Sequence, residues 1–581
     1  MDTPAPTRSS FFTTHIPADN HLWTAGFFNE RFPDVVSPLG WSVVRRLVEQ
    51  AAFREPLSFV GCWLPPDYPL IKLYCGHVYT NVGAFQRLYR VFPAPLVPRG
   101  AGRYFPSADT SLRFAVPAPS RATFLKSAAR TFVTEAGWHP FNYVVWERFV
   151  KRFDSRVAGC LQQIEASRAP SALLRQVDEL MALSLDLLRL HRWSLTYADV
   201  LFDLLRRLVS AWVDAGDAEE LTATLLVGRP NRSTETDAAL WRLAQQATAL
   251  DADSLDRLRG GRFTAFLDGL DATSAGRRFA QSFHGFLADY GHRSPSLDLR
   301  YPAYVDDPAG VLALIAQFLD IGGEGPAARE HAQEQRRLSA TRHVRRASGD
   351  LSARWWLFRS LLSFAQRYTA LREDQRYYWQ KSMYGKRQAF LRIGQAWASE
   401  DMLARDDDIF FLTLDEITGV VRGWLRAPEI RDLVEARRTE FEVLHGAAYP
   451  PFLQGQVPLS EVVPARGDVS HELLGLPASP GRARGPALVV SGPAALDGAW
   501  QRLLPNSVLV TGSTDPAWTP LFLRVRGLVM ERGGQLSHGA VVAREYGLPA
   551  VVGVAGALDR IADGQIIDVD GATGRVTLLP A

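Results

Sequence analysis

Cysteine is scarce in this sequence of 581 residues, which contains three of them. Cys62, Cys75 and Cys160 lie far apart, so they predict neither a disulfide framework nor the closely spaced pairs that bind zinc. Such low cysteine usage is typical of proteins from a reducing compartment. We therefore expect a cytoplasmic protein whose fold does not depend on disulfide bonds.

Long hydrophobic runs are also missing. No segment approaches the roughly 18 uninterrupted apolar residues that a membrane-spanning helix needs. Residues 1–20 contain one arginine, several prolines and threonines and no continuous apolar core, so they predict a disordered leader rather than a signal peptide or an anchor. The 65 basic and 62 acidic side chains are spread along the whole chain, which predicts no binding to nucleic acids or membranes.

A nucleotide-binding loop is the third absence. The chain has no G-x-x-x-x-G-K-[ST] motif, and its glycine-rich segments 479–487 and 532–539 lack the lysine that contacts phosphates in such loops. The three aspartates at 406–408 precede an apolar run, which favours a solvated turn over a metal site. We therefore expect no cofactor or metal to be held by a motif of this chain.

The sequence does contain enough apolar residues for several domains. Its length and its hydrophobic content of 47% predict about two to four globular domains. Residues 21–445 show mainly helical periodicity, with a mixed part rich in proline, glycine and aromatic residues up to about residue 115. Prolines recur every few residues in 446–472, which predicts a swivel linker. Residues 473–581 alternate short β runs with turns and one strong helix, which predicts a small α/β domain.

Residues 351–400 make up a long helical segment that contains no proline. The pattern predicts one or two long helices, with a break near Gly385 because glycine weakens a helix interior. The predicted fold is thus multidomain, with a large, mainly α-helical domain followed by a small C-terminal α/β domain.

A lone histidine, His538, lies where a predicted strand gives way to a predicted helix. Gly533 and Gly534 permit a tight turn after the strand, and Ser537 is a favourable N-cap. Helix N-terminal amides favour an anion, and neutral imidazole is a nucleophile near physiological pH. A phosphoryl group on His538 would lie among the amides of Gly539 and its neighbours. The residues alone indicate a histidine that handles an anion; a histidine that only packs near a helix start is the alternative.

The segment GGQLSHGAVVAREYGLPAVVGV, residues 533–554, resembles the signature of the phosphohistidine (swivelling) domain shared by phosphoenolpyruvate synthase, pyruvate phosphate dikinase and rifampin phosphotransferase. Two preceding segments, ASPGRARGPALVV and TDPAWTPLFLRVRGLVMERGG, resemble the same family, the second most closely its rifampin phosphotransferase branch. The resemblance implies that His538 is phosphorylated and then carried between two sites. It also implies that the adjoining glycines and Ser537 bind the phosphate.

The similarity covers nearly the whole chain from about residue 20. LWTAGFFNERFPDVVSPLGWSVV, YGHRSPSLDLRYPAYVDDP and LREDQRYYWQKSMYGKRQAFLRIGQ resemble landmarks of the helical substrate-binding domain of rifampin phosphotransferases. In that family an ATP-binding domain of the grasp type precedes the substrate domain, whereas here the first landmark begins at Leu22. The resemblance therefore implies a two-component system similar to phenylphosphate synthase, in which a separate ATP-grasp protein uses ATP and Mg²⁺ to phosphorylate His538.

Phosphoryl transfer to a hydroxyl requires positive charge around the moving group. In the helix predicted for residues 371–392, Arg372, Lys386 and Arg387 are candidates to bind the phosphate of the acceptor site. The landmark in which they lie supports that role. A basic surface face on a long helix is the alternative.

The acceptor site also needs a group that removes the hydroxyl proton. His292 and Arg293 follow a glycine at a predicted helix end, where they could act as base and phosphate contact or could simply cap the helix. Asp298 is a candidate to orient His292.

The predicted function is a phosphotransferase component that carries an ATP-derived phosphoryl group on His538 to a hydroxyl of a small organic substrate. The resemblance suggests an aromatic or natural-product substrate. Two alternatives stay open. One is a dehydratase or condensing enzyme that uses phosphate only as a leaving group, and the other is a relative that binds a ligand without turnover.

Overall fold

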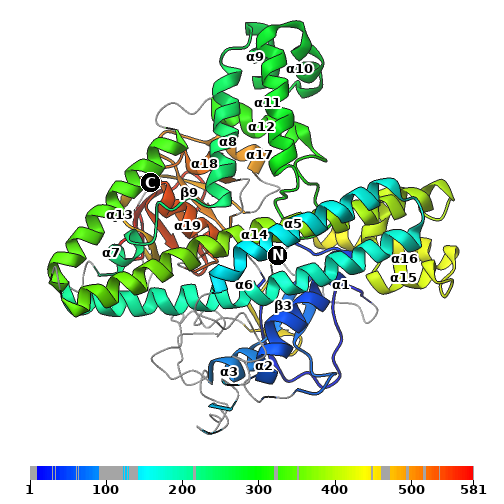
Figure 1. The fold of residues 1–581 in the computed structure, drawn as a ribbon, viewed down its shortest axis with the longest axis horizontal. Coiled ribbons are helices and arrows are strands. Elements are labelled where there is room, and N and C mark those ends of the chain that lie inside the picture. Colours follow the sequence, from blue (N-terminus) through cyan, green and yellow to red (C-terminus); the bar gives the residue numbers. More distant parts are fainter. Residues whose placement is uncertain are drawn as a thin grey trace. The chain divides into compact units, whose positions relative to one another are not determined.

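The chain folds into two compact units. Unit 1 comprises residues 1–200, 296–301 and 378–467, and unit 2 comprises residues 201–295, 302–377 and 468–581. The long helices α6 (Pro170–Trp212) and α14 (Ala353–Ser399) contribute residues to both units (Figure 1). The predicted fold class, mainly helical with a small C-terminal α/β region, is confirmed. The helical region predicted as one domain is divided between the two units.

The computed structural model describes residues 10–28, 31–32, 34–59, 62, 64–90, 122, 125–126, 129, 142–213, 218–319, 325–349, 352–445, 449–459, 471–491, 496–514, 518–534 and 537–579. Within these ranges, no helix combines the length and the hydropathy that crossing a bilayer requires.

Unit 1 contains an antiparallel sheet with the strand order β2-β3-β1-β4-β5. Its strands are β1 (Leu22–Thr24), β2 (Ile71–Tyr74), β3 (His77–Asn81), β4 (Phe452–Gln454) and β5 (Val457–Pro458). Phe452 pairs with Thr24 in this sheet. Residues 452–458, which lie within the linker predicted for 446–472, are therefore part of this sheet. They are held there because β4 pairs with β1, near the other end of the sequence. Residues 460–470 lie outside the described residues.

Residues 10–20, which the sequence places in a disordered leader, are ordered in unit 1. The amide of Thr14 donates to the carbonyl of Leu73 at 2.9 Å, and the side chain of Phe12 is fully buried. Asp19 forms a buried ion pair with Lys72, whose ammonium group lies 2.8 Å from the carboxylate. The leader prediction is wrong for this segment because its partners lie far along the chain, where local composition does not reveal them.

The helices assigned to unit 1 alone are short to medium in length. They are α1 (Pro38–Val48), the π-helix η1 (Glu49–Arg54), α2 (Glu55–Phe59), α3 (Val82–Arg90), α5 (Asn142–Ala166), the 3₁₀ helix η7 (Asp406–Phe411), α15 (Leu414–Val421) and α16 (Ala427–Leu444). In α1, the Ser37 side chain caps the first turn and Pro38 occupies a position where the missing N–H costs nothing.

The predicted break near Gly385 is wrong. Helix α14 runs without interruption through this position. A Cβ at Gly385 would lie 2.9 Å from Cδ1 of Leu180 on α6. The glycine therefore allows α6 and α14 to approach closely in unit 1, and the packing gained there offsets its weak helix propensity.

The three aspartates at 406–408 form the first turn of η7 rather than a solvated turn. Asp408 is buried, and its carboxylate pairs with Arg438 and accepts a hydrogen bond from the amide of Arg405 at 2.9 Å. Asp407 pairs with the side chain of Arg405 at 3.0 Å. The prediction of a solvated turn is wrong for Asp408 because an arginine distant in sequence compensates its charge.

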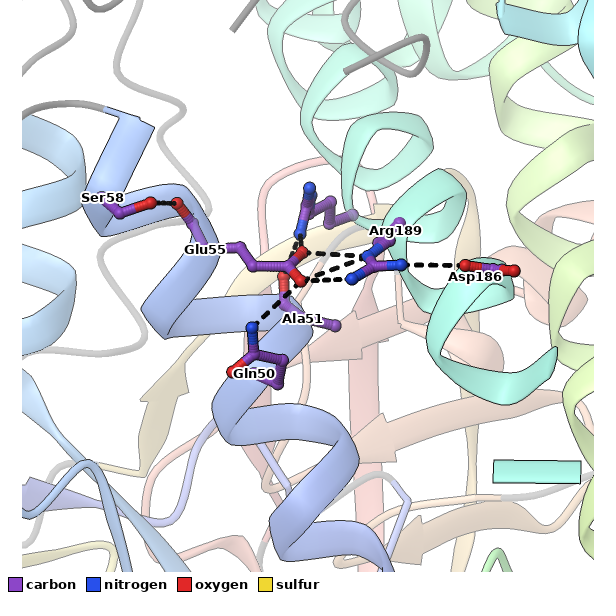
Figure 2. A network of polar contacts seen from close by, with 7 residues as sticks. Gln50, Ala51, Glu55, Ser58, Asp186 and Arg189 are labelled. Atoms are coloured by element: carbon purple, nitrogen blue, oxygen red, sulfur yellow. Dashed lines mark hydrogen bonds and ion pairs between the residues drawn. The ribbon is translucent and has the colours of Figure 1, made fainter. Parts of the chain in front are cut away.

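Glu55 joins the short helix α2 to the long helix α6 (Figure 2). Its carboxylate accepts hydrogen bonds from Arg189 and Arg192, each at 2.7 Å at the closest, and from Gln50 at 3.1 Å. Arg192 also donates to the carbonyl of Ala51 in the π-helix at 2.6 Å. Burial would raise the pKa of Glu55, but the two guanidinium groups outweigh it and lower the pKa to about 2.

Unit 2 contains helices α7 (Ala218–Thr224), α8 (Arg232–Ala247), α9 (Ala252–Arg259), α10 (Phe263–Gly269), α11 (Ser274–Tyr290), α12 (Pro308–Leu319) and α13 (Pro326–Ser348), with the 3₁₀ helix η6 (Leu270–Ala272). The apolar faces of α8, α9, α10, α11 and α12 meet in a core that includes Leu243, Phe279, Phe283, Ile315 and Phe318. This core keeps the helices of residues 232–319 together.

The C-terminal part of unit 2 is a mixed sheet with the order β6-β13-β12-β8-β9-β10-β11-β7. Its elements are β6 (Glu472–Leu474), β7 (Leu476–Ser479), β8 (Arg482–Val490), α17 (Leu496–Arg502), β9 (Val508–Thr511), α18 (Thr519–Phe522), β10 (Gly527–Met530), α19 (His538–Glu545), β11 (Ala550–Val552), α20 (Ala557–Arg560), β12 (Ile566–Asp570) and β13 (Arg575–Leu578).

Strands β8, β9, β10 and β11 of this sheet are parallel to one another, and the other pairs are antiparallel. β7 lies at one edge, where Pro477 pairs opposite Val551 of β11. Two apolar clusters pack with the sheet, one around Leu509, Leu528 and Ala543 and the other around Val510, Val529 and Ile567. The parallel strands end on the same side, which places the loops that follow them together.

Replacing Glu55 with glutamine should lower the free energy of unfolding at pH 7 by about 2 kcal/mol, because two arginines lose their carboxylate partner. The folded-state pKa of Glu55 lies below its ordinary value of 4.5, so its stabilisation is present above pH 4.5 and is lost as the pH falls towards 2. Urea unfolding followed by tryptophan fluorescence should show this difference shrinking with falling pH. Glu165→Gln, at an exposed site on α5, is the control. A pH-independent difference would contradict the assignment.

Candidate functional site

Loops that follow three parallel strands converge at the start of α19. The amide of Glu531, after β10, donates to the carbonyl of Thr511 at the end of β9, at 2.9 Å. The amide of Arg532 donates to the carbonyl of Gly512 at 3.0 Å. After β11, the amide of Val554 donates to the carbonyl of Met530 at 3.1 Å. The carboxyl edge of a parallel sheet is where α/β proteins usually bind ligands.

The predicted phosphate-binding residues Gly533, Gly534 and Ser537 all lie in this loop cluster. Gly533 has φ +114°, a backbone conformation that favours glycine. A Cβ at Gly533 would lie 3.0 Å from the Ser537 hydroxyl oxygen. The carbonyl of Gly534 accepts a hydrogen bond from the amide of Ser537 at 2.9 Å. The turn that the glycines permit thus places Ser537 in position to cap the helix.

Helix α19 begins at His538, as the sequence predicts. Ser537 has φ −64° and ψ 158°, and its hydroxyl oxygen accepts from the amide of Ala540. The helix ends at Glu545, and Gly547 follows with φ +62°. His538 therefore occupies the first helical position, where helix amides have no intrahelical acceptor. Its imidazole lies outside the described part of the structure.

Gly539 is surrounded so closely that a side chain at this position would have to displace its neighbours. A Cβ at this position would lie 2.3 Å from the hydroxyl oxygen of Thr514 and 2.5 Å from the sulfur of Met530. Thr514 itself is buried and donates a hydrogen bond to the Met530 sulfur at 3.6 Å. The backbone at Gly539 is therefore held against the ends of β9 and β10.

Sequence reasoning missed Thr514 and Arg532 in this cluster. The side chain of Arg532 donates to the carbonyl of Gly512 at 3.4 Å and adds a positive charge beside the Gly533 turn. Both residues follow predicted strands. The signal that would have identified them is the parallel pairing of β9 with β10, which brings their ends together.

His292 and Arg293, predicted for the acceptor site, follow helix α11 as expected and are both buried. The His292 ring lies edge-on to Tyr377 of α14, with ring centroids 4.4 Å apart. Arg293 donates to the hydroxyl of Thr236 on α8 at 2.9 Å. Arg372, a third predicted residue of unit 2, lies on α14 with its guanidinium 4.0 Å from the carboxylate of Glu373.

The other three predicted acceptor residues belong to unit 1. Arg387 donates to the carbonyls of Leu299 and Arg300 at 2.6 and 3.0 Å, and Lys386 is fully buried. Asp298, expected to orient His292, instead accepts hydrogen bonds from the amide and hydroxyl of Ser37 at 2.7 and 2.5 Å. The joint role of these residues with His292 in one acceptor site stays a prediction.

Lys386 lies in a polar cluster between α6 and α14 of unit 1. Its ammonium group donates to the Ser184 hydroxyl at 2.5 Å, and Ser184 shares a hydrogen bond of 2.8 Å with Ser382. Burial lowers the pKa of Lys386 to about 7. The burial makes it a residue of the helix interface rather than of a basic surface.

Residues 193–373 match the family described as the rifampicin phosphotransferase fourth domain, and residues 503–574 match the mobile domain of PEP-utilising enzymes. Chondramide synthase of Chondromyces crocatus is 35% identical over 387 residues, which are 61% of this chain and 10% of that protein. An uncharacterized phosphotransferase of Bacillus subtilis is 28% identical over 61% of this chain and 43% of its own length. A rifampicin phosphotransferase of a Streptomyces species is 34% identical over 328 residues, which are 55% of this chain and 37% of that protein. The chain thus spans less than half the length of each of these relatives.

Replacing Gly539 with alanine should destabilise the C-terminal domain by about 1–3 kcal/mol, because the added methyl group collides with Thr514 and Met530. Gly498→Ala on α17 is the matched control, since a Cβ there meets nothing within 4 Å. Thermal unfolding of the two variants should show a lower midpoint for Gly539→Ala and an unchanged or higher one for the control. Equal midpoints would contradict the close packing.

Replacing Lys386 with methionine should make stability less dependent on pH. The folded-state pKa near 7 lies below the ordinary value of 10.5, so the unfolded chain binds more protons between these values. The free energy of unfolding of the wild type should therefore rise with pH in this window, by at most about 1.4 kcal/mol per pH unit. Urea unfolding at pH 7, 8 and 9 should show a smaller slope for Lys386→Met and an unchanged slope for Lys151→Met, at an exposed position on α5. An unchanged slope for Lys386→Met would refute the assignment.

Proposed function

We propose that this chain is a phosphotransferase component that carries a phosphoryl group on His538, because residues 503–574 match the mobile domain of PEP-utilising enzymes and residues 193–373 match the rifampicin phosphotransferase fourth domain. The observation that carries the proposal is the placement of His538 at the first position of α19, at the carboxyl edge of a parallel sheet. This location and the family match support the same chemistry independently.

The local geometry suits a phosphorylated histidine. Amides of the first turn of α19 point out of the helix N-terminus, where the helix dipole favours negative charge. The glycine backbone at 533, 534 and 539 lets these amides approach a phosphoryl group without interference from side chains. Arg532 supplies a positive side chain to the same loop cluster. These groups would stabilise the oxygens of a phosphoryl group held on the imidazole.

The proposed reaction has two transfers. In the first, an imidazole nitrogen of His538 attacks a phosphorus atom in the phosphate chain of ATP, so that a P–N bond forms while the bond from that phosphorus to the leaving oxygen of the nucleotide breaks. In the second, a substrate hydroxyl oxygen attacks the phosphorus, the P–N bond breaks, and the hydroxyl proton passes to a base. His292 is the proposed base, and Arg293 and Arg372 of the same unit are the proposed phosphate-binding residues of the acceptor site.

We place the ATP site, with its Mg²⁺, on a separate protein of the ATP-grasp type. The proposed acceptor is a hydroxyl of a small organic substrate. Its aromatic or natural-product character is inferred from the family of residues 193–373 alone.

The phosphohistidine is tested first without any partner, with potassium phosphoramidate as a small phosphoryl donor. Mass spectrometry under mildly alkaline conditions should find an acid-labile phosphate on the peptide that contains His538. The His538→Ala variant should lack it, whereas His471→Ala, at an exposed histidine of the same domain, should retain it. A candidate ATP-grasp partner with labelled ATP should then give the same adduct. Absence of the adduct with both donors, together with full turnover of His538→Ala, would reject the proposal.

A second candidate function is supported by the chondramide synthase relative, whose name indicates synthesis rather than phosphorylation. In this version the phosphorylated substrate loses phosphate to give a dehydrated or condensed product. Product analysis distinguishes the two, because a stable phosphoester supports the first function and an unphosphorylated alkene or coupled product supports the second. Ligand binding that is unchanged in His538→Ala, without any phosphoenzyme, would indicate a binding protein instead.

A further inference from the structure

The end of α19 opposite His538 contacts the helical part of unit 2. The hydroxyl of Tyr546 donates to a carboxylate oxygen of Asp237 on α8 at 2.9 Å. Asp237 is buried, so this charge-assisted hydrogen bond is shielded from water. The guanidinium of Arg329 on α13 lies 5.8 Å from the centre of the Tyr546 ring.

A second contact is made by Glu545, the last residue of α19. Its carboxylate accepts a hydrogen bond from the amide of Gly228 at 3.1 Å. Gly228 is fixed on α13, since Arg337 donates to its carbonyl and, at 3.1 Å, to the carbonyl of Val227. Gly228 has φ +66°, and a Cβ there would lie 2.8 Å from the amide nitrogen of Glu334. The amide of Gly228, which Glu545 contacts, thus belongs to a loop that Arg337 and the backbone of α13 hold in place.

The contact is completed by the chain just after α19. A Cβ at Gly547 would lie 2.9 Å from Nε2 of Gln333 and 3.0 Å from Nη1 of Arg336. Positions 329, 333 and 336 are spaced by about one helical turn, so α13 presents one face to the end of α19.

Few apolar side chains of the carrier region, residues 471–579, pack against the neighbouring helical core. In the core cluster of α8, α11 and α12, the described carrier residues are Leu523 and the half-buried Tyr546. The contact is therefore carried mainly by hydrogen bonds and charge. Polar contacts of this kind are typical of domain surfaces that separate and rejoin, whereas permanent interfaces bury large apolar areas.

We propose that Tyr546 and Glu545 form a latch that holds the carrier region on Asp237 of α8 and the amide of Gly228, in a docked state that opens as the carrier moves. The physical latch stands on the contacts above, and its role in delivery rests on the proposed function of His538. His538 and Glu545 are the two ends of one helix about 10 Å long, so opening the latch moves the histidine with it. Tyr546, Glu545 and Asp237 are positioning residues in this scheme.

Hydrogen–deuterium exchange of the full chain tests the latch directly. In the wild type, the exchange rate of peptides that cover residues 225–231 should depend less on urea concentration than the exchange rate of residues 311–318 in the core helix α12. A weak dependence on urea indicates a local opening rather than unfolding of the core. Tyr546→Phe and Asp237→Asn should each increase exchange of 225–231 about tenfold, because each removes the same charge-assisted hydrogen bond. The double variant should show about the same increase as either single variant, since the two residues act as a pair.

Two controls separate a local opening from general destabilisation. Asp268→Asn, at an exposed position on α10, should leave the exchange of 225–231 unchanged. Residues 311–318 should keep their protection in all variants. Exchange of 225–231 only through global unfolding in the wild type would overturn the latch. Exchange of 225–231 that is unchanged in Tyr546→Phe and Asp237→Asn would also overturn the latch. The same holds for an increase of about a hundredfold in the double variant, which would mean that the two residues act independently.

The latch and the proposed function fail in different ways. His538→Ala should retain the wild-type exchange of 225–231, because the latch does not use the imidazole. If both latch variants increase that exchange but phosphoramidate never phosphorylates His538, the latch stands and the carrier function fails. If the phosphohistidine forms while the latch variants exchange as the wild type does, the carrier function stands and the latch is wrong.

Discussion

The start of α19 is packed so closely against the ends of β9 and β10 that the residue after His538 has no room for a side chain. Gly539 lies against Thr514 and Met530, and Gly533 adopts a backbone conformation that brings Ser537 into its capping position. The exposed amides of the helix and the carboxyl edge of the sheet are thereby brought to one place. This steric constraint explains why glycine occupies positions 533 and 539.

Elements that depend on local signals were predictable from the sequence. Ser537 and Gly547 mark the two ends of α19 because capping and chain reversal are properties of single residues and their immediate neighbours. The alternation of short apolar runs likewise indicated the α/β domain after residue 472. The turn at Gly533 and Gly534 was predicted for the same reason, since its conformation is local.

Errors arose where distant segments decide the structure. Gly385 looks like a helix break in sequence, yet Leu180 packs against it and the helix continues. Phe452 looks like part of a linker, but it pairs with Thr24 at the other end of the chain. For Lys386 the sequence left open a phosphate-binding role or a basic surface face, and its burial against Ser184 follows from how α6 and α14 meet. In each case the partner is more than 190 residues away, and composition around the residue contains no information about it.

The edge strand β7 has a consequence for a domain proposed to change partners during its cycle. A strand at the border of a sheet presents backbone groups to which a strand of another molecule can bind. Pro477 has no N–H, so that border lacks one of the donors that an added strand from another molecule would need. The proline therefore disfavours the pairing of a further strand with β7 at that position.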